Sequence, residues 1–188
     1  DKILKKNVKH QGVIVLSKKL VLADYKNLFE NKSFKYGVIL DSITDPNNMG
    51  AIYRSANAFG IDFIINSNQR ALIESSALLN TACGAFENVN SYTTNNISNA
   101  IKKFKEEGWW VVGLDHKAAT EVNEIFLKAD SKEKYIFIFG SEGKGIRRLI
   151  KKNCNLVTKI PHIVNTHSIN VSNAAAIIFH EIFKFRKM

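Results

Sequence analysis

The sequence lacks the features of membrane, disulfide-stabilised and metal-binding proteins. None of its apolar runs approaches the roughly 20 residues needed to cross a bilayer, and no apolar targeting segment with a cleavage-like end opens the chain. Its only cysteines, Cys83 and Cys154, are too few for a disulfide framework and stand in no Cys-x-x-Cys or Cys-x-x-His spacing. We therefore expect a cytoplasmic protein without bound metal, whose two thiols are buried and inert.

Methionine is also scarce, since only Met49 and Met188 are present, and the first residue is Asp1. We therefore expect the natural start to lie upstream of this sequence. The 188 residues are 45% hydrophobic and 10% aromatic. A single domain of about this size buries roughly 70% of its unfolded surface, so a substantial core is expected.

Acidic residues are outnumbered, because 17 Asp and Glu stand against 27 Lys and Arg and leave a net charge of +10. The excess is uneven: residues 1–36 hold nine lysines against three acidic residues, a local charge of 9 − 3 = +6. Such an excess favours polyanionic partners through phosphate contacts and counterion release. An ordinary solvated, lysine-rich surface explains the same composition, so charge alone does not establish RNA binding.

We expect residues 1–35 to form a basic segment or linker and residues 36–188 to form one α/β domain. Short apolar runs alternate there with helical patterns, which is typical of a mainly parallel sheet with helices on both faces. The predicted strands are Gly37–Asp41, Phe63–Asn66, Val89–Tyr92, Trp109–Leu114, Tyr135–Gly140 and Leu156–Ile160. The predicted helices are Met49–Phe59, Asn96–Glu107 and Asn170–Phe185.

Open α/β sheets bind ligands beyond the carboxyl ends of their strands, and three loops at such positions carry polar residues. In the first loop, Pro46 stiffens a turn that Asp or Asn can cap. Gly50 then allows another backbone to approach closely. Arg54 lies one turn after Gly50, so its guanidinium is expected to reach back to the strand-end crevice near Asn48. The alternative is a solvent-exposed helix arginine.

The second loop is glycine-rich, with Gly140, Gly143 and Gly145 after a predicted strand. Glycines there expose backbone amides at a helix start, which suits polar or anionic ligand atoms. The Gly-x-Gly-x-x-Gly motif of dinucleotide-binding proteins fails because Arg148 stands at its third glycine, and the Walker motif fails because Ile146 stands at its lysine. A Rossmann oxidoreductase or an NTPase is disfavoured, and a purely structural glycine connection is the alternative.

The third loop, residues 160–170, places Ser168 and Asn170 before the last predicted helix. Ser168 is a candidate helix cap. Both side chains are also candidates for orienting a hydroxyl or a ligand amide in a closed pocket. His162 and His167 suggest a metal, but no acidic residue or cysteine has a suitable spacing to them, so a metal site is disfavoured.

Taken together, the loops resemble the SpoU (TrmH-like) family of RNA ribose 2'-O-methyltransferases, within the SPOUT superfamily. The ordered motifs are Asp45-Pro46-x-Asn48-x-Gly50-x3-Arg54, Phe139-Gly140-x-Glu142-Gly143-x-Gly145, and Ile160-Pro161 with Ser168-Ile169-Asn170-Val171-Ser172. The resemblance covers about residues 36–185. His10-Gln11-Gly12 resembles the linker of the branch that methylates a guanosine ribose in large-subunit ribosomal RNA. The small RNA-binding domain that usually precedes this linker is expected to be missing from this sequence.

The resemblance implies a deep C-terminal trefoil knot, a homodimer formed through the knotted region, and S-adenosylmethionine as methyl donor. The donor would contact Leu114, Gly140, Ile160, Ile169 and Asn170. The residues that the family uses on the ribose hydroxyl match Arg54, Asn48, Glu142, Ser168 and Asn170. Arg54 would either act as the base or hold the neighbouring phosphate and the developing oxyanion; a pKa above about 12 makes arginine an awkward base.

Two positions depart from the family pattern. His162-Ile163-Val164 stand where the family usually has Met and then a small residue such as Gly, which leaves the conformation of the cofactor loop open. Ile169 replaces the usual Leu, a volume-conserving change. The implied function is methylation of a guanosine in large-subunit ribosomal RNA. A transfer RNA ribose methyltransferase and a noncatalytic RNA-binding module are the alternatives, because the motifs describe the donor site and the ribose rather than the target base.

Overall fold

The structure, a computed structural model, describes residues 21–67, 75–128, 132–141, 143, 145–163 and 168–187. Several residues that the sequence singles out lie outside these ranges, namely His10-Gln11-Gly12, Glu142, Val164 and His167. The path of the predicted knot includes residues 164–167, which are also outside the described ranges, so the knot stays a prediction.

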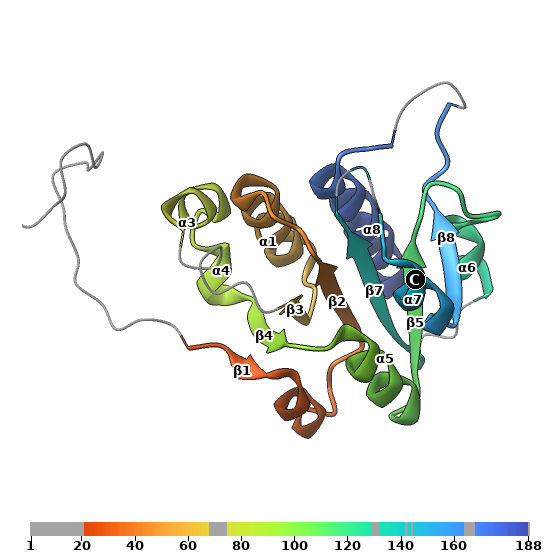
Figure 1. The fold of residues 1–188 in the computed structure, drawn as a ribbon, viewed down its shortest axis with the longest axis horizontal. Helices are drawn as coiled ribbons and strands as arrows, with labels where there is room; N and C mark the ends of the chain where they lie inside the picture. Colours follow the sequence, from red (N-terminus) through yellow and green to blue (C-terminus); the bar gives the residue numbers. More distant parts are fainter. Residues whose placement is uncertain are drawn as a thin grey trace, which may run out of the picture.

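The described residues form one sheet of eight strands, which runs from β1 at the left of Figure 1 to β8 at the right, with β6 as the edge strand beside β8. Every neighbouring pair is parallel, as the sequence predicts, and the order is β1-β4-β3-β2-β7-β5-β8-β6. The strands are β1 (Ala23–Asp24), β2 (Tyr36–Asp41), β3 (Phe63–Ser67), β4 (Asn90–Thr94), β5 (Trp109–Leu114), β6 (Thr120–Glu121), β7 (Lys134–Gly140) and β8 (Leu156–Lys159).

Helices cover both faces of the sheet, which confirms the predicted architecture. One apolar cluster packs under α1, α3, α4, α6 and α8, and a second packs under η1, α5 and α7. None of the helices in the described ranges is both long enough and apolar enough to cross a membrane. Their bounds are η1 (Tyr25–Glu30, a 3-10 helix), α1 (Pro46–Phe59), α3 (Ser76–Ala82), α4 (Ala85–Asn88), α5 (Ile97–Glu106), α6 (Val122–Lys128), α7 (Arg148–Asn153) and α8 (Val171–Lys187).

The six predicted strands and three predicted helices are all present, and all except β5 differ from the prediction at one or both ends. The largest shift is in α1, which begins at Pro46 rather than at Met49, because the Asp45 carboxylate caps the helix by accepting from the N–H of Asn47 at 2.9 Å. Two edge strands were not predicted, since strands of two residues carry no periodic signal. One of them, β1, pairs with β4, so residues 23–24 belong to the same sheet as the other described strands.

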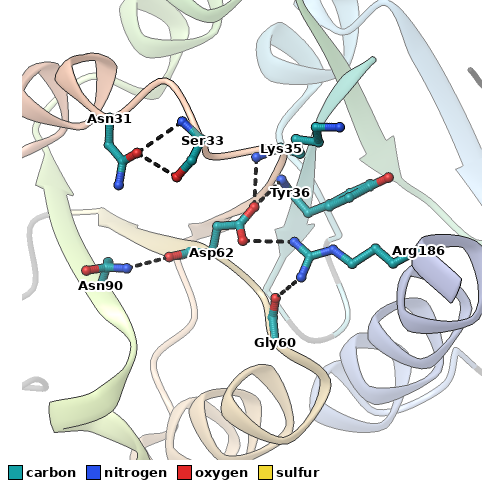
Figure 2. Close-up of polar contacts among 8 residues, drawn as sticks. All are labelled: Asn31, Ser33, Lys35, Tyr36, Gly60, Asp62, Asn90 and Arg186. Carbon is teal, nitrogen blue, oxygen red and sulfur yellow. Dashed lines mark hydrogen bonds and ion pairs between the residues drawn. The ribbon is translucent and has the colours of Figure 1, made fainter. Parts of the chain in front are cut away.

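The last turn of α8 is fastened to the amino-terminal edge of the sheet, as Figure 2 shows. The Asp62 carboxylate, just before β3, accepts hydrogen bonds from the N–H groups of Lys35 at 2.8 Å and Tyr36 at 2.7 Å. Its other oxygen, Oδ1, lies 2.9 Å from Nη2 of Arg186. Arg186 also donates a hydrogen bond to the carbonyl of Gly60, and its Cζ lies 4.4 Å from the centroid of the Tyr36 ring. This contact fixes the end of α8 that lies away from the candidate site.

Candidate active site

A cavity of about 380 Å³ lies at the carboxyl ends of three neighbouring strands. Leu114 ends β5, Gly140 ends β7 and Ile160 directly follows β8. Parallel strands bring their carboxyl ends to one edge of a sheet, where ligand sites form. The segment that enters α8 completes the wall with Ser168, Ile169, Asn170, Val171 and Ala174. All five residues that the family resemblance assigns to the cofactor therefore line one cavity.

The glycine-rich loop forms one wall of this cavity by folding tightly back on itself. A Cβ on Gly140 would lie 2.0 Å from the carbonyl carbon of Gly145, so only glycine permits this approach of two backbones. The N–H of Gly145 donates to the carbonyl of Ser141 at 2.8 Å. Gly143 and Gly145 both have positive φ, at 78° and 64°. The three glycines thus have a steric role in shaping the cavity wall.

Asn170 joins the third loop to the first. Its side-chain N–H donates to the side-chain oxygen of Asn48 at 3.1 Å, and Asn48 itself is buried. Its own side-chain oxygen accepts from the N–H of Ser172 at 2.9 Å and of Asn173 at 3.4 Å. Asn170, and not the predicted Ser168, therefore caps α8; Ser168 is exposed and lines the cavity without capping the helix.

The first loop is held by the local features that the sequence predicts. Pro46 occupies the first turn of α1 after the Asp45 cap. A Cβ on Gly50 would lie 2.7 Å from the carbonyl oxygen of Leu78, so the close backbone approach predicted at Gly50 is made by α3. These contacts fix the start of α1, and with it the position of Asn48.

Arg54 does not reach the crevice as expected. Its side chain is exposed and its Nη1 lies 3.7 Å from the sulfur of Cys83, at the end of α3. Among the described residues that line the cavity, Arg54 is missing. The reason is helical geometry: six residues separate it from Asn48, which rotates its side chain by about 240° around the helix axis. The structure brings Asn48 and Asn170 together and leaves Arg54 on another surface of its own chain.

Charged residues that were not predicted surround the same strand ends. Asp115 follows β5, lines the cavity and pairs with Lys151 of α7 at 2.7 Å. Burial opposes ionisation of Asp115, but the hydrogen bonds from Lys151 and from the N–H of Lys117, with the positive charge of Lys151, outweigh it and lower its pKa. His116 and Lys159 line the cavity too. Their positions directly after or at the end of a strand were the available sequence signal.

Beneath the glycine loop, Asp41 ends β2 with its carboxylate fully buried. Arg147, the residue before α7, contacts this carboxylate, with Nη2 at 2.8 Å from Oδ1. Asp41 is the last residue of a predicted strand, but nothing in the sequence indicated that it contacts a residue 106 positions away.

The histidine and cysteine side chains differ in part from expectation. His162 lines the cavity, with Nδ1 at 2.8 Å from the carbonyl oxygen of Ile160. Within the described ranges, no three His, Cys, Asp or Glu side chains gather as a metal site would require. Cys83 is exposed, so the expectation of a buried thiol is wrong there, because the residue ends α3 at the surface. Burial raises the pKa of the half-buried Cys154 to about 11, which keeps that thiol protonated near neutral pH.

The fold and the cavity together define a protein with a small-molecule site at the carboxyl edge of a parallel α/β sheet. Residues 35–180 match the model of the SpoU rRNA Methylase family. A Staphylococcus haemolyticus protein named "Putative TrmH family tRNA/rRNA methyltransferase" is 33% identical over 184 residues, covering 96% of this chain and 72% of its own length. An uncharacterized tRNA/rRNA methyltransferase of Borreliella burgdorferi is 36% identical over 97% of this chain and 82% of its own length. The chain belongs to the SpoU methylase family.

A solved structure agrees in fold. The crystal structure of the SpoU methyltransferase AviRb from Streptomyces viridochromogenes, in complex with the cofactor AdoMet, matches with a TM-score of 0.76 at 21% sequence identity. The match covers 90% of this chain and 64% of AviRb, so the chain spans somewhat less than two thirds of that protein.

Proposed function

We propose that this protein transfers a methyl group from S-adenosylmethionine to a ribose 2'-hydroxyl of RNA. The observation that carries the proposal is that two of the three sequence motifs line one cavity, through Gly140, Ile160 and Asn170, while the first motif is joined to it by the hydrogen bond between Asn170 and Asn48. Family membership and the AdoMet complex of AviRb support the same reaction. When bound, S-adenosylmethionine supplies an electrophilic methyl group on its sulfonium; the protein must hold it and present the hydroxyl in line.

The cavity suits such a donor in size and lining. Its volume of about 380 Å³ lies within the range of roughly 300–1,000 Å³ that is typical of cofactor sites. Apolar side chains of Leu114 and Ile169 supply contact area, and the tight backbone at Gly140 leaves room at the wall. We propose that Leu114, Gly140, Ile160, Ile169 and Asn170 hold the donor.

We propose that Asn48, Ser168 and Asn170 orient the ribose hydroxyl, together with Glu142. Asn48 and Asn170 are already joined by a hydrogen bond, and Ser168 lines the same cavity. A group on the RNA side must also stabilise the oxygen as it loses its proton. We assign that role to Arg54, as a clamp on the neighbouring phosphate and the developing oxyanion or, less readily for a guanidinium, as the base.

Because Arg54 lies outside the cavity of its own chain, its proposed role requires a second copy. We propose a homodimer in which α1 and α8 belong to the interface, so that Arg54 of one subunit faces the cavity of the other. These two helices pack side by side, as Figure 1 shows; α1 carries Arg54, and Val171 and Ala174 of α8 line the cavity.

For the substrate, we propose a guanosine of large-subunit ribosomal RNA, with transfer RNA as the alternative. The His10-Gln11-Gly12 linker favours ribosomal RNA, and the relatives' names include both classes. The net charge of +10 supports an RNA partner of either class. The proposed site of action is the cytoplasm, where both RNAs are found.

Two measurements test the proposal. Titration calorimetry with S-adenosylmethionine should give about one donor per subunit. Incubation with methyl-labelled donor should then transfer label to ribosomal RNA fragments, and the same fragments with a 2'-deoxyribose at the target should accept none. Label on transfer RNA alone would shift the substrate class to the alternative. A folded protein that binds RNA but not the donor would contradict the proposal and favour a noncatalytic RNA-binding module.

A further inference from the structure

We propose that Asp41 and Arg147 are a positioning pair that sets the shape of the glycine-rich wall of the cavity. The inference rests on the proposed function, because the wall in question is the one proposed to hold S-adenosylmethionine. Neither residue lines the cavity itself. Their proposed effect on the donor is exerted through the loop from Gly140 to Ile146.

The pair has the geometry of a forked ion pair on a buried carboxylate. Asp41 is fully buried at the end of β2. Arg147 places Nη2 at 2.8 Å from Oδ1 and Nε at 3.2 Å from Oδ2. Its backbone N–H also donates to Oδ2, at 3.3 Å. Bidentate arginine–carboxylate contacts of this kind fix orientation as well as position, which a lysine cannot reproduce.

The pair anchors the returning end of the glycine loop. The loop leaves the sheet at Gly140, which is the register partner of Asp41 in the β2–β7 ladder. It returns to Arg147, the N-cap residue of α7. The Arg147 side chain does not cap the helix by a hydrogen bond to its first backbone N–H groups. The two ends of the loop are therefore held at one point of the sheet, by the ladder at one end and by the Asp41 carboxylate at the other.

The loop has little tolerance for movement of that anchor. Gly140 and Gly145 approach so closely that a Cβ on Gly140 would lie 2.2 Å from the N of Ile146. Gly140, Gly143 and Gly145 all line the cavity, so a shift of residues 145–147 changes the cavity wall directly. Since backbone contacts there are the proposed donor contacts, loss of the anchor should weaken donor binding.

Asp41 also connects the glycine loop with the first loop. The hydroxyl of Ser42 donates to Asp41 Oδ1 at 3.0 Å, and Ser42 has a positive φ of 59°, rare for a residue with a side chain. The chain runs from this turn to Asn48, which contacts Asn170 at the cavity. One buried carboxylate therefore orders both the proposed donor wall and the approach to the ribose side.

The side chain of Arg147 can be removed with little disturbance to packing, because it is 61% exposed. Arg147→Met keeps its length and loses the fork, and Arg147→Lys keeps the charge alone. Arg148→Met is the matched control, since Arg148 is the next residue, is exposed and begins the same helix. We expect the dissociation constant for S-adenosylmethionine to rise about tenfold in Arg147→Met and by an intermediate factor in Arg147→Lys, with Arg148→Met within about twofold of the original protein.

A variant of the partner separates positioning from an uncompensated buried charge. Asp41→Asn combined with Arg147→Met removes both charges, so the double variant should bind the donor about as weakly as Arg147→Met alone, since the fork is still missing. Affinity restored to that of the original protein would assign the loss to the uncompensated buried charge and overturn the positioning role. A lowered midpoint of unfolding in Arg147→Met with an unchanged dissociation constant would show a merely structural pair and overturn the inference.

Hydrogen exchange provides a readout that does not depend on the donor. Amides of residues 141, 143 and 145–147 should exchange about tenfold faster in Arg147→Met than in Arg148→Met, while amides of β7 stay protected. If the original protein binds no S-adenosylmethionine, the proposed function fails, yet this exchange difference still supports the anchoring of the loop. Equal exchange in the two variants would overturn the positioning role whatever the ligand.

Discussion

The side-chain amide of Asn170 donates a hydrogen bond of 3.1 Å to the side-chain oxygen of Asn48, across 122 positions of sequence. This bond joins the first turn of α1 to the segment before α8 at the edge of the cavity. The same Asn170 side chain caps α8 through its oxygen. The side-chain oxygen of Asn170 thus stabilises the helix, and its side-chain N–H group makes the contact at the candidate site. A substitution that keeps the oxygen and removes the N–H group can separate the two roles.

Asn170→Ser should weaken binding of S-adenosylmethionine while leaving the fold intact. Serine is as good a helix cap as asparagine, so the change in the free energy of unfolding should stay within about 0.5 kcal/mol. The lost amide donor should raise the dissociation constant about tenfold, which corresponds to about 1.4 kcal/mol. Calorimetry and denaturant melts measure the two effects, with the exposed Asn173→Ser as control. Unchanged affinity would remove Asn170 from the donor site.

Arg54→Ala should reduce methyl transfer at least about a hundredfold, as expected for loss of a group that stabilises developing charge.

A complementation experiment tests whether Arg54 acts on the cavity of its own subunit or on that of the partner. Ala174→Phe, in the cavity wall, should block donor binding in its own chain. A heterodimer of the Arg54→Ala and Ala174→Phe chains, isolated with two affinity tags, keeps one complete site only if Arg54 acts on its partner's cavity. We therefore expect about half of the original activity; an inactive heterodimer would place Arg54 in service of its own chain.

The Asp115–Lys151 pair should make stability depend on pH only in the acid range. The pKa of Asp115 is lowered from its ordinary 3.8, so the folded state binds fewer protons than the unfolded state. Its stabilisation is therefore present above that ordinary value and is lost as pH falls through the folded-state pKa. Because Lys151 is 40% exposed, the pair should contribute about 0.2–1 kcal/mol, like other solvent-accessible pairs.

Urea melts of Lys151→Met between pH 7 and pH 3 test the predicted pH dependence of the Asp115–Lys151 pair. The difference in unfolding free energy from the original protein should be constant between pH 7 and pH 5 and should shrink below about pH 4. A difference that persists unchanged at pH 3 would mean that the packing of the Lys151 stem, and not its charge, stabilises the fold.

Arg186→Met should destabilise the protein without affecting the candidate site. It removes the ion pair with Asp62, a bond to the Gly60 carbonyl and the contact over the Tyr36 ring. We expect a loss of about 1–3 kcal/mol, since the Arg186 side chain is largely covered. Thermal melts should show the loss of stability in Arg186→Met. As a control, Lys184→Met removes the ion pair with Glu181 on the same helix and should cost less than about 0.5 kcal/mol. A weaker affinity for S-adenosylmethionine in Arg186→Met would mean that α8 transmits the disturbance along its whole length.

Local sequence patterns predicted most of the sheet. β5 lies at the predicted residues, and β7 differs by one, because buried parallel strands are continuous apolar runs bounded by turns.

The sequence predicted that polar residues cap the helices, but it did not always identify the capping residue. Asp45 caps α1 as its position suggests, whereas Asn170 rather than Ser168 caps α8, since both residues are capable and only the start of the helix selects between them.

The sequence by itself determined the class of fold and the residues from which a site could be built, since apolar periodicity, glycines and caps act over a few neighbouring positions. Only the tertiary structure decided which of those residues meet. The insertion of β7 between β2 and β5 places Gly140 beside Asp41, and the packing of the start of α8 against the start of α1 joins Asn170 to Asn48. Such contacts join residues about a hundred positions apart, and they are selected by the packing of the whole sheet and its helices rather than by any local preference.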